Sequence, residues 1–138
     1  MRSASEKLAA PAVNDVSEPF GLTFSGDTPR IVNTGAIAKP GEINQADREI
    51  PYDGGREVFG GTAFAYQLDR EGNPAQPYAA YMKLDNGARI VVMGEGMASL
   101  FLGAPEGVRL TIQPGNPKWW GKDSQIFMEA VLRWLLAR

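Results

Sequence analysis

The sequence predicts one layered α/β domain, in which a mixed β-sheet carries a C-terminal helix packed on it. Length and composition support a single domain, because 138 residues with 43% apolar and 22% charged residues suit one globular core. A turn signal at 85–87, followed by an apolar run, predicts a hairpin strand. A stretch at 124–136 that is apolar on most of its circumference predicts the terminal helix.

The first half of the chain gives weaker patterns. Residues 1–19 predict a short N-terminal helix with a loose end, and Pro11 would kink or delay it. Residues 35–56 are poor in large apolar groups and rich in Pro, Gly and charge, so they predict a surface loop. Residues 57–69 predict a strand that Gly60-Gly61 bulges or breaks in two.

The hairpin is the clearest element. Asp85-Asn86-Gly87 is a tight-turn signal, because Asn and Gly tolerate a positive φ. The following run, Ala88–Met93, is apolar apart from Arg89. Such a run is typical of a strand that is covered on both faces, so we expect it to be central in the sheet.

The terminal helix is expected to begin at about Asp123, which would act as its N-cap. Its polar stripe is narrow and consists of Gln125, Glu129 and Arg133. A helix with so much apolar surface is packed on more than one side. We therefore expect one side to lie on the sheet and the other on a second chain, which predicts a homodimer through this helix.

Three segments carry a family resemblance: "VNDVSEPFGLTF" (13–24), "NGARIVVMGEGMASLFLGAPEG" (86–107) and "WWGKDSQIFMEAVLRWLL" (119–136). In this order they resemble the C-terminal part of class I glutamine-amidotransferase-like domains, the flavodoxin-like α/β domains also found in ThuA-like and intraflagellar-transport-type proteins. The resemblance covers most of this chain but only about the latter half of such a domain. It implies a flavodoxin-like half-domain whose uncovered surfaces are closed by dimerisation.

The resemblance does not carry the amidotransferase activity, which needs a Cys nucleophile and a His base, because this chain contains no Cys and no His. The same absences exclude disulfides, thiolate chemistry and a Ser-His-Asp triad. A net charge of -2 argues against nucleic acid, and no run of about 18 apolar residues predicts a membrane span. The N-terminus lacks a clear signal peptide, so we expect a cytoplasmic protein, or a periplasmic or secreted one if a leader was trimmed.

Gly94-Glu95-Gly96 is the first candidate site. In open α/β sheets ligands collect at the carboxyl ends of strands, and glycines let a ligand approach the backbone. Glu95 there can act as a base or bind a cation. The structural alternative, which is commoner for so short a motif, is a strand-to-helix turn that Glu95 caps.

The second candidate region precedes the terminal helix. Trp119-Trp120 can stack on a sugar, a ring or a cation, or can seal the packing of the helix. Lys122-Asp123 can polarise a ligand at the helix N-terminus, where an anion is favoured, or Asp123 can simply cap the helix. The acidic turn residues Asp69, Glu71 and Asp85 lack the spacing of a Ca²⁺ loop, so no metal site is expected.

These residues leave several functions open. The one we expect is a non-catalytic ligand-binding or assembly domain, without a cofactor and completed by dimerisation. A second is a hydrolase of a small ester, lactone or amide, in which Glu95 with Asp123 or Asp15 activates water and Ca²⁺ can assist. A third is a fragment without independent activity, whose fold a second copy completes.

Overall fold

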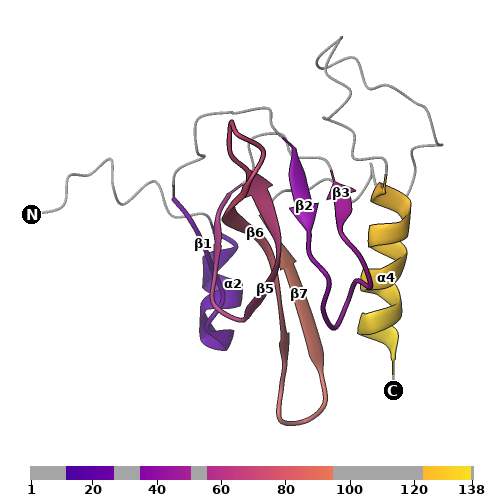
Figure 1. Cartoon of the computed structure of the whole chain (residues 1–138). Coiled ribbons are helices and arrows are strands. Elements are labelled where there is room, and N and C mark those ends of the chain that lie inside the picture. The colour runs from indigo at the N-terminus through magenta and orange to yellow at the C-terminus, as the bar shows by residue number, and fades with distance from the viewer. Residues whose placement is uncertain (1–11, 27–34, 51–55, 95–122, 138) are drawn as a thin grey trace, which may run out of the picture.

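The computed structural model describes residues 12–26, 35–50, 56–94 and 123–137. Its main sheet has five strands in the order β3-β2-β5-β6-β7, and every pairing in it is antiparallel. The strands are β2 (Ala36–Ala38), β3 (Arg48–Ile50), β5 (Thr62–Leu68), β6 (Pro74–Lys83) and β7 (Arg89–Met93). Figure 1 shows these strands between a short helix, α2 (Asn14–Ser17), and the C-terminal helix α4 (Ser124–Leu136).

The core lies between the sheet and α4, as predicted. The helix buries Phe127, Met128, Val131 and Trp134. Phe127 stacks on Phe64 of β5 with ring centroids 5.9 Å apart, and Trp134 meets Tyr81 of β6 edge-on at 5.0 Å. Each fully buried side chain of this size is worth about 1.5–3 kcal/mol. These four residues therefore hold α4 to the sheet.

Arg89 of β7 fastens the C-terminal end of α4. Its guanidinium lies over the Trp134 ring, 5.1 Å from the centroid, and donates to the Trp134 carbonyl oxygen. A cation at a helix C-terminus satisfies a carbonyl that has no partner within the helix. The single charge in an otherwise apolar strand is thus a helix anchor.

A second, smaller layer lies beside β6 and β7. It consists of α2, the 3₁₀ turn η1 (Glu18–Phe20) and a two-stranded antiparallel sheet of β1 (Thr23–Phe24) and β4 (Val58–Phe59). Phe24 and Val58 pack on Ala80 and Val92, which are cross-strand partners. The side-chain amide of Asn14 binds the backbone of Phe24 in both directions, at 3.0 and 2.8 Å.

The glycine and turn predictions are confirmed. β4 ends at Phe59 and β5 begins at Thr62, so Gly60-Gly61 breaks the segment into two strands. A Cβ on Gly60, whose φ is +87°, would lie 1.9 Å from the carbonyl oxygen of Gly21. The β6–β7 hairpin closes through Asp85-Asn86-Gly87, and Gly87 has a φ of +86°.

Three predictions need correction. The sheet is antiparallel instead of mixed; consecutive links join β2 to β3, β5 to β6 and β6 to β7, and β2 also pairs antiparallel with β5. Among the described strands Arg89–Met93 is an edge strand, and all five of its residues are only half-buried. The predicted loop at 35–56 contains β2 and β3. The strand pattern is weak because each strand has three residues, with β2 built mainly from Ala and β3 mainly from charged residues. Flavodoxin-like layering, which needs parallel strands between helices, is not confirmed.

The N-terminal helix predicted within 1–19 is seen from Asn14 to Ser17, and residues before 12 lie outside the described part. None of the helices in the described ranges is long and apolar enough to cross a membrane.

Candidate functional site

Most of the predicted site lies outside the described residues. Glu95, Gly96, Trp119, Trp120 and Lys122 all belong to 95–122. The structure describes two of the predicted positions, Gly94 and Asp123, and both are engaged by the chain itself.

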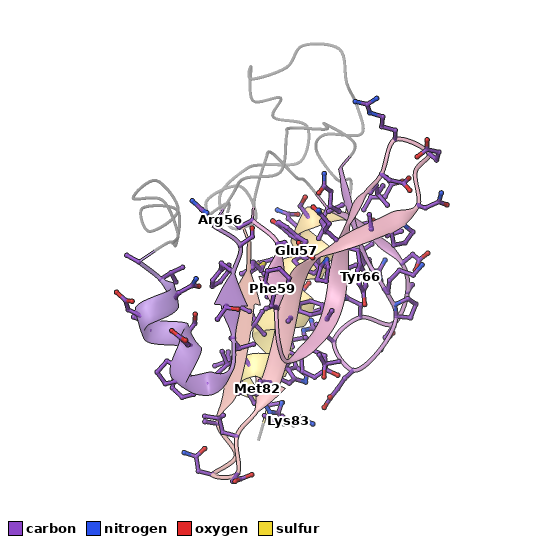
Figure 2. All side chains as sticks on the ribbon, turned by 90° about the vertical axis from the view of Figure 1, so that its left-hand side faces the viewer. Arg56, Glu57, Phe59, Tyr66, Met82 and Lys83 are labelled. Atoms are coloured by element: carbon purple, nitrogen blue, oxygen red, sulfur yellow. The ribbon has the colours of Figure 1, made fainter. Side chains whose placement is uncertain are left out.

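Gly94 connects the main sheet to the segment that leads into β4 of the smaller layer. Its N–H donates to the Tyr78 carbonyl and its own carbonyl accepts from the Arg56 N–H, both at 2.8 Å. A Cβ at this position would lie 1.8 Å from the Arg56 carbonyl oxygen. The Arg56 guanidinium (Figure 2) in turn donates to the Ser25 carbonyl at 2.7 Å. The close approach that glycine permits here is therefore made by the backbone of Arg56, and both backbone groups of Gly94 are already used.

Asp123 is the N-cap residue of α4, as predicted, but its side chain makes no capping hydrogen bond. Its carboxylate accepts instead from the Glu49 N–H at 2.9 Å, and its own N–H donates to the Glu49 carbonyl at 3.2 Å. This pair of bonds docks the start of α4 on the outer edge of β3. Asp15, the other carboxylate predicted to act with Glu95 in a hydrolase site, belongs to α2 on the opposite side of the strands (Figure 1). Asp15 and Asp123 therefore lie apart, and Glu95, with which either was predicted to act, lies outside the described residues.

The acidic residues of the described ranges do not gather into a metal site. No group of three or more Asp or Glu side chains there is arranged to hold an ion.

A cavity of about 380 Å³ lies between α4 and the 39–47 loop, which joins β2 to β3. The loop and the start of β3 contribute Glu42, Ile43, Asn44, Gln45 and Arg48. The helix contributes Ile126, Glu129, Ala130, Arg133 and Trp134. None of these residues was predicted for a site, so this cavity is the feature that sequence reasoning missed.

The two carboxylates of the cavity are both neutralised by cations. Glu42 pairs with Lys83, which lies at the hairpin end of β6 (Figure 2). The hydrogen bond from Lys83 lowers the pKa of Glu42 below its ordinary value, and the Trp134 and Tyr81 side chains add to that lowering against an opposing effect of burial. Glu129 pairs with Arg133 at 2.6 Å, one helical turn away.

Arg48 is different, because it makes no ion pair with any described residue. It is half-buried, and it shares a face of β3 with Ile50, which is fully buried in the core against α4. Since alternate residues of a strand point to the same side, the Arg48 side chain is directed towards the helix layer. Within the described ranges, the cavity therefore contains one uncompensated positive charge.

Two buried polar groups beside the cavity also lack hydrogen bonds. Asn44 is 2% exposed, and within the described structure neither its side-chain nitrogen nor its oxygen has a partner. The Trp134 indole N–H is also buried without a hydrogen bond of normal geometry to any described residue, although the ring lies near Glu42. Leaving such a group unpaired costs about 1–3 kcal/mol.

A signal for this cavity was present in the loop sequence. Ile43 is the one large apolar residue in "KPGEINQAD", and it is buried with Asn44 beside it. A buried apolar residue inside a polar loop indicates that the loop folds back on the domain.

Comparison with known proteins gives no match: no family model, no curated protein and no solved structure resembles the chain closely enough to be assigned to it. The function of the chain must therefore be inferred from its own geometry.

Proposed function

We propose that this chain is a non-catalytic assembly domain that pairs with a second copy through the outer face of α4. The observation that carries the proposal is a stripe on that face which is complementary to itself. We define the stripe as Ile126, Glu129, Arg133 and Leu136, at spacings of three, four and three residues. This spacing keeps the four side chains on one side of a helix.

The stripe is open to solvent and partly apolar. Ile126 is 48% exposed and Leu136 is 79% exposed. The opposite face of α4 is buried on the sheet, so the helix has only this side to offer. A second copy of the helix would cover both of these apolar side chains.

The order of chemistry along the stripe suits an antiparallel helix pair. In an antiparallel pair the two-fold axis crosses the outer face of the helix at the level of Val131. Ile126 then faces Leu136 of the second copy, and Glu129 faces Arg133 of the second copy. Apolar groups then meet apolar groups, and each carboxylate meets a cation. A parallel pair would instead place each charge opposite its own copy, which is unfavourable.

The expected association is weak. The Glu129–Arg133 ion pair of a single copy is highly exposed, and exposed ion pairs contribute little to stability. Replacing it by the same pair across an interface therefore changes the free energy of association only slightly. One helical face also buries less than the roughly 1,600 Å² of a standard interface. We therefore expect a dimer with a micromolar dissociation constant.

Sedimentation equilibrium over a wide dilution range tests the proposal. Wild-type protein should dissociate on dilution, whereas E129R and R133E should each remain monomeric, because like charges then face one another. Mixing E129R with R133E should restore association, because every contact then joins a cation to a carboxylate. Repulsion within one helix cannot produce rescue on mixing, so rescue identifies a contact between copies.

A charge reversal elsewhere serves as the control. E71R alters an exposed residue of the β5–β6 turn and should leave the dissociation constant unchanged. Circular dichroism should show that all variants keep their helix content. Wild-type protein that stays monomeric at every concentration, or a mixture that does not associate, would overturn the proposal.

The family relationship and the hydrolase alternative remain predictions. The amidotransferase-like relationship depends on the sequence resemblance alone, and the antiparallel sheet differs from the parallel sheet of those domains. The hydrolase alternative depends on Glu95, and loss of ester hydrolysis in E95Q would be its test.

A further inference from the structure

The cavity between α4 and the 39–47 loop combines an unpaired cation with unpaired hydrogen-bonding groups, as far as the described residues go. We infer that it is a binding site for a small molecule that carries a carboxylate on a short aliphatic chain. Ile126, Glu129 and Arg133 belong both to the cavity and to the stripe, so ligand binding and dimerisation must be measured separately. Asn44 and Arg48, on which the inference depends, do not belong to the stripe.

Charge selects an anion. Glu42 is held by Lys83 and Glu129 by Arg133, so both carboxylates that line the cavity are neutralised. Arg48 has no such partner in the described part of the chain and projects from β3 towards the helix layer. A guanidinium presents a planar set of donors that matches a carboxylate, and a hydrogen bond between two charged groups is stronger than one between neutral groups.

The second group is Asn44, whose buried side-chain amide has no partner among the described residues for its nitrogen or its oxygen. A carboxylate oxygen can accept from the amide nitrogen, and a carboxylate bound by Arg48 brings such an oxygen into this cavity. Nearly all buried polar side chains in proteins are hydrogen-bonded. Asn44 lines the cavity, but its amide atoms have almost no accessible surface, so an occupant meets them only when this side chain turns towards the cavity.

The remaining wall suits a short apolar chain. Ile43, Ile126 and Ala130 line the cavity together with Trp134, whose ring is buried. A volume of about 380 Å³ lies at the small end of ligand pockets and fits a molecule of the size of a short fatty acid. Polar and apolar groups are thus both present, as in most small-molecule sites.

Nuclear magnetic resonance of the Trp134 indole N–H tests the inference, with sodium hexanoate as the probe. The W134F variant assigns this signal among the three tryptophans of the chain. Hexanoate should shift the signal saturably, with a dissociation constant in the millimolar range. Hexanamide, which has the same shape without the charge, and acetate, which lacks the chain, should each bind about tenfold or more weakly.

Three variants locate the site. R48Q and N44L should each weaken hexanoate binding about tenfold, with unchanged circular dichroism. K39Q is the matched control, because Lys39 is a cation of the same loop that pairs with Asp47 and does not line the cavity. It should bind as the wild type does. Repeating the titration in L136Q, which breaks the stripe without touching the cavity, keeps the result separate from dimerisation.

Several results would overturn the inference. They are the absence of a hexanoate shift up to its solubility limit, equal binding of hexanoate and hexanamide, or undiminished binding in R48Q. If acetate binds as tightly as hexanoate, Arg48 is a general anion site and the proposed aliphatic chain is wrong.

Discussion

The two layers that flank the sheet are held in different ways. On one side α4 is held by large side chains: Phe127 stacks on Phe64 of β5, and Trp134 meets Tyr81 of β6 edge-on. On the other side the apolar contact of Phe24 and Val58 is smaller. There α2, β1 and β4 are also held by backbone contacts, through glycines that allow close approach and through the Asn14 amide. The stability of the α4 layer should therefore fall when a buried side chain is shortened. The stability of the α2, β1 and β4 layer should fall when a side chain is added at a glycine.

Removal of the Phe127 ring should have the largest effect. Phe127 is fully buried, so F127A leaves a cavity between α4 and β5 and should lower the free energy of unfolding by about 3–5 kcal/mol. Chemical denaturation at low protein concentration measures it. The neighbouring I126A removes a half-exposed side chain and should cost less than about 1 kcal/mol. Equal losses in both variants would mean that α4 is not held through its inner face.

The backbone layer can be tested with two glycines of the same conformation. Gly60 and Gly72 both have a φ of +87°, but a Cβ at Gly60 would meet the Gly21 carbonyl at 1.9 Å, whereas one at Gly72 would meet nothing within 4 Å. G72A should cost about 1–2 kcal/mol from the left-handed backbone alone. G60A should cost about 1–3 kcal/mol more, because the backbone must also move. Similar losses in the two variants would contradict the close approach.

Asn44 is the exception on the α4 side, because it is a buried polar residue in an apolar layer. N44L should raise the free energy of unfolding by about 1 kcal/mol, since it removes an amide that has no hydrogen bond to the described residues. Its exposed neighbour gives the control, and Q45L should change stability by less than about 0.5 kcal/mol. A loss of stability in N44L would show that the amide has a partner in the folded chain.

The smallest expected effect on stability concerns Glu42 of the 39–47 loop, which lies beside α4. Lys83 lowers the pKa of Glu42 below its ordinary value of 4.5. The Glu42 carboxylate therefore stabilises the fold at a pH above its ordinary pKa. This stabilisation is lost as the pH falls through the lowered pKa of the folded state. Denaturation of wild type and E42Q at pH 7 and pH 3 should show a slightly smaller acid loss in E42Q, whereas E71Q should behave as wild type. An unchanged loss in E42Q would contradict the role of this pair.

The same contrast explains how much of the fold could be predicted. The helix α4 could be predicted because its apolar side chains recur at helical spacing in the sequence. The β6–β7 hairpin could be predicted because its turn is Asp-Asn-Gly. β2 and β3 were missed, because strands of three residues, one built mainly from Ala and one with two charged residues, have no clear alternation. The edge position of β7 depends on which strands pair at long range, and local pattern does not specify it.

The candidate site shows the same limit. Arg48, Asn44 and the α4 residues come from segments about 80 positions apart, and only the folding of the 39–47 loop onto the helix brings them together. Gly94 was predicted to let a ligand approach the backbone, whereas the structure places the backbone of Arg56 there, which local sequence could not show. Asp123 was correctly placed as the N-cap residue, whereas its bond to Glu49 depends on where β3 lies.

The two hydrogen bonds between Asp123 and Glu49 affect how the edge of the sheet can meet other chains. β3 is an outer strand of the described sheet, and its middle residue, Glu49, directs both its N–H and its carbonyl to the outside. Asp123 uses both groups. An exposed strand edge is a template on which extended segments of other molecules can add and aggregate. A single aspartate at the start of a helix thus closes this edge to strand addition, and the chain is protected there against growth into larger β-structures.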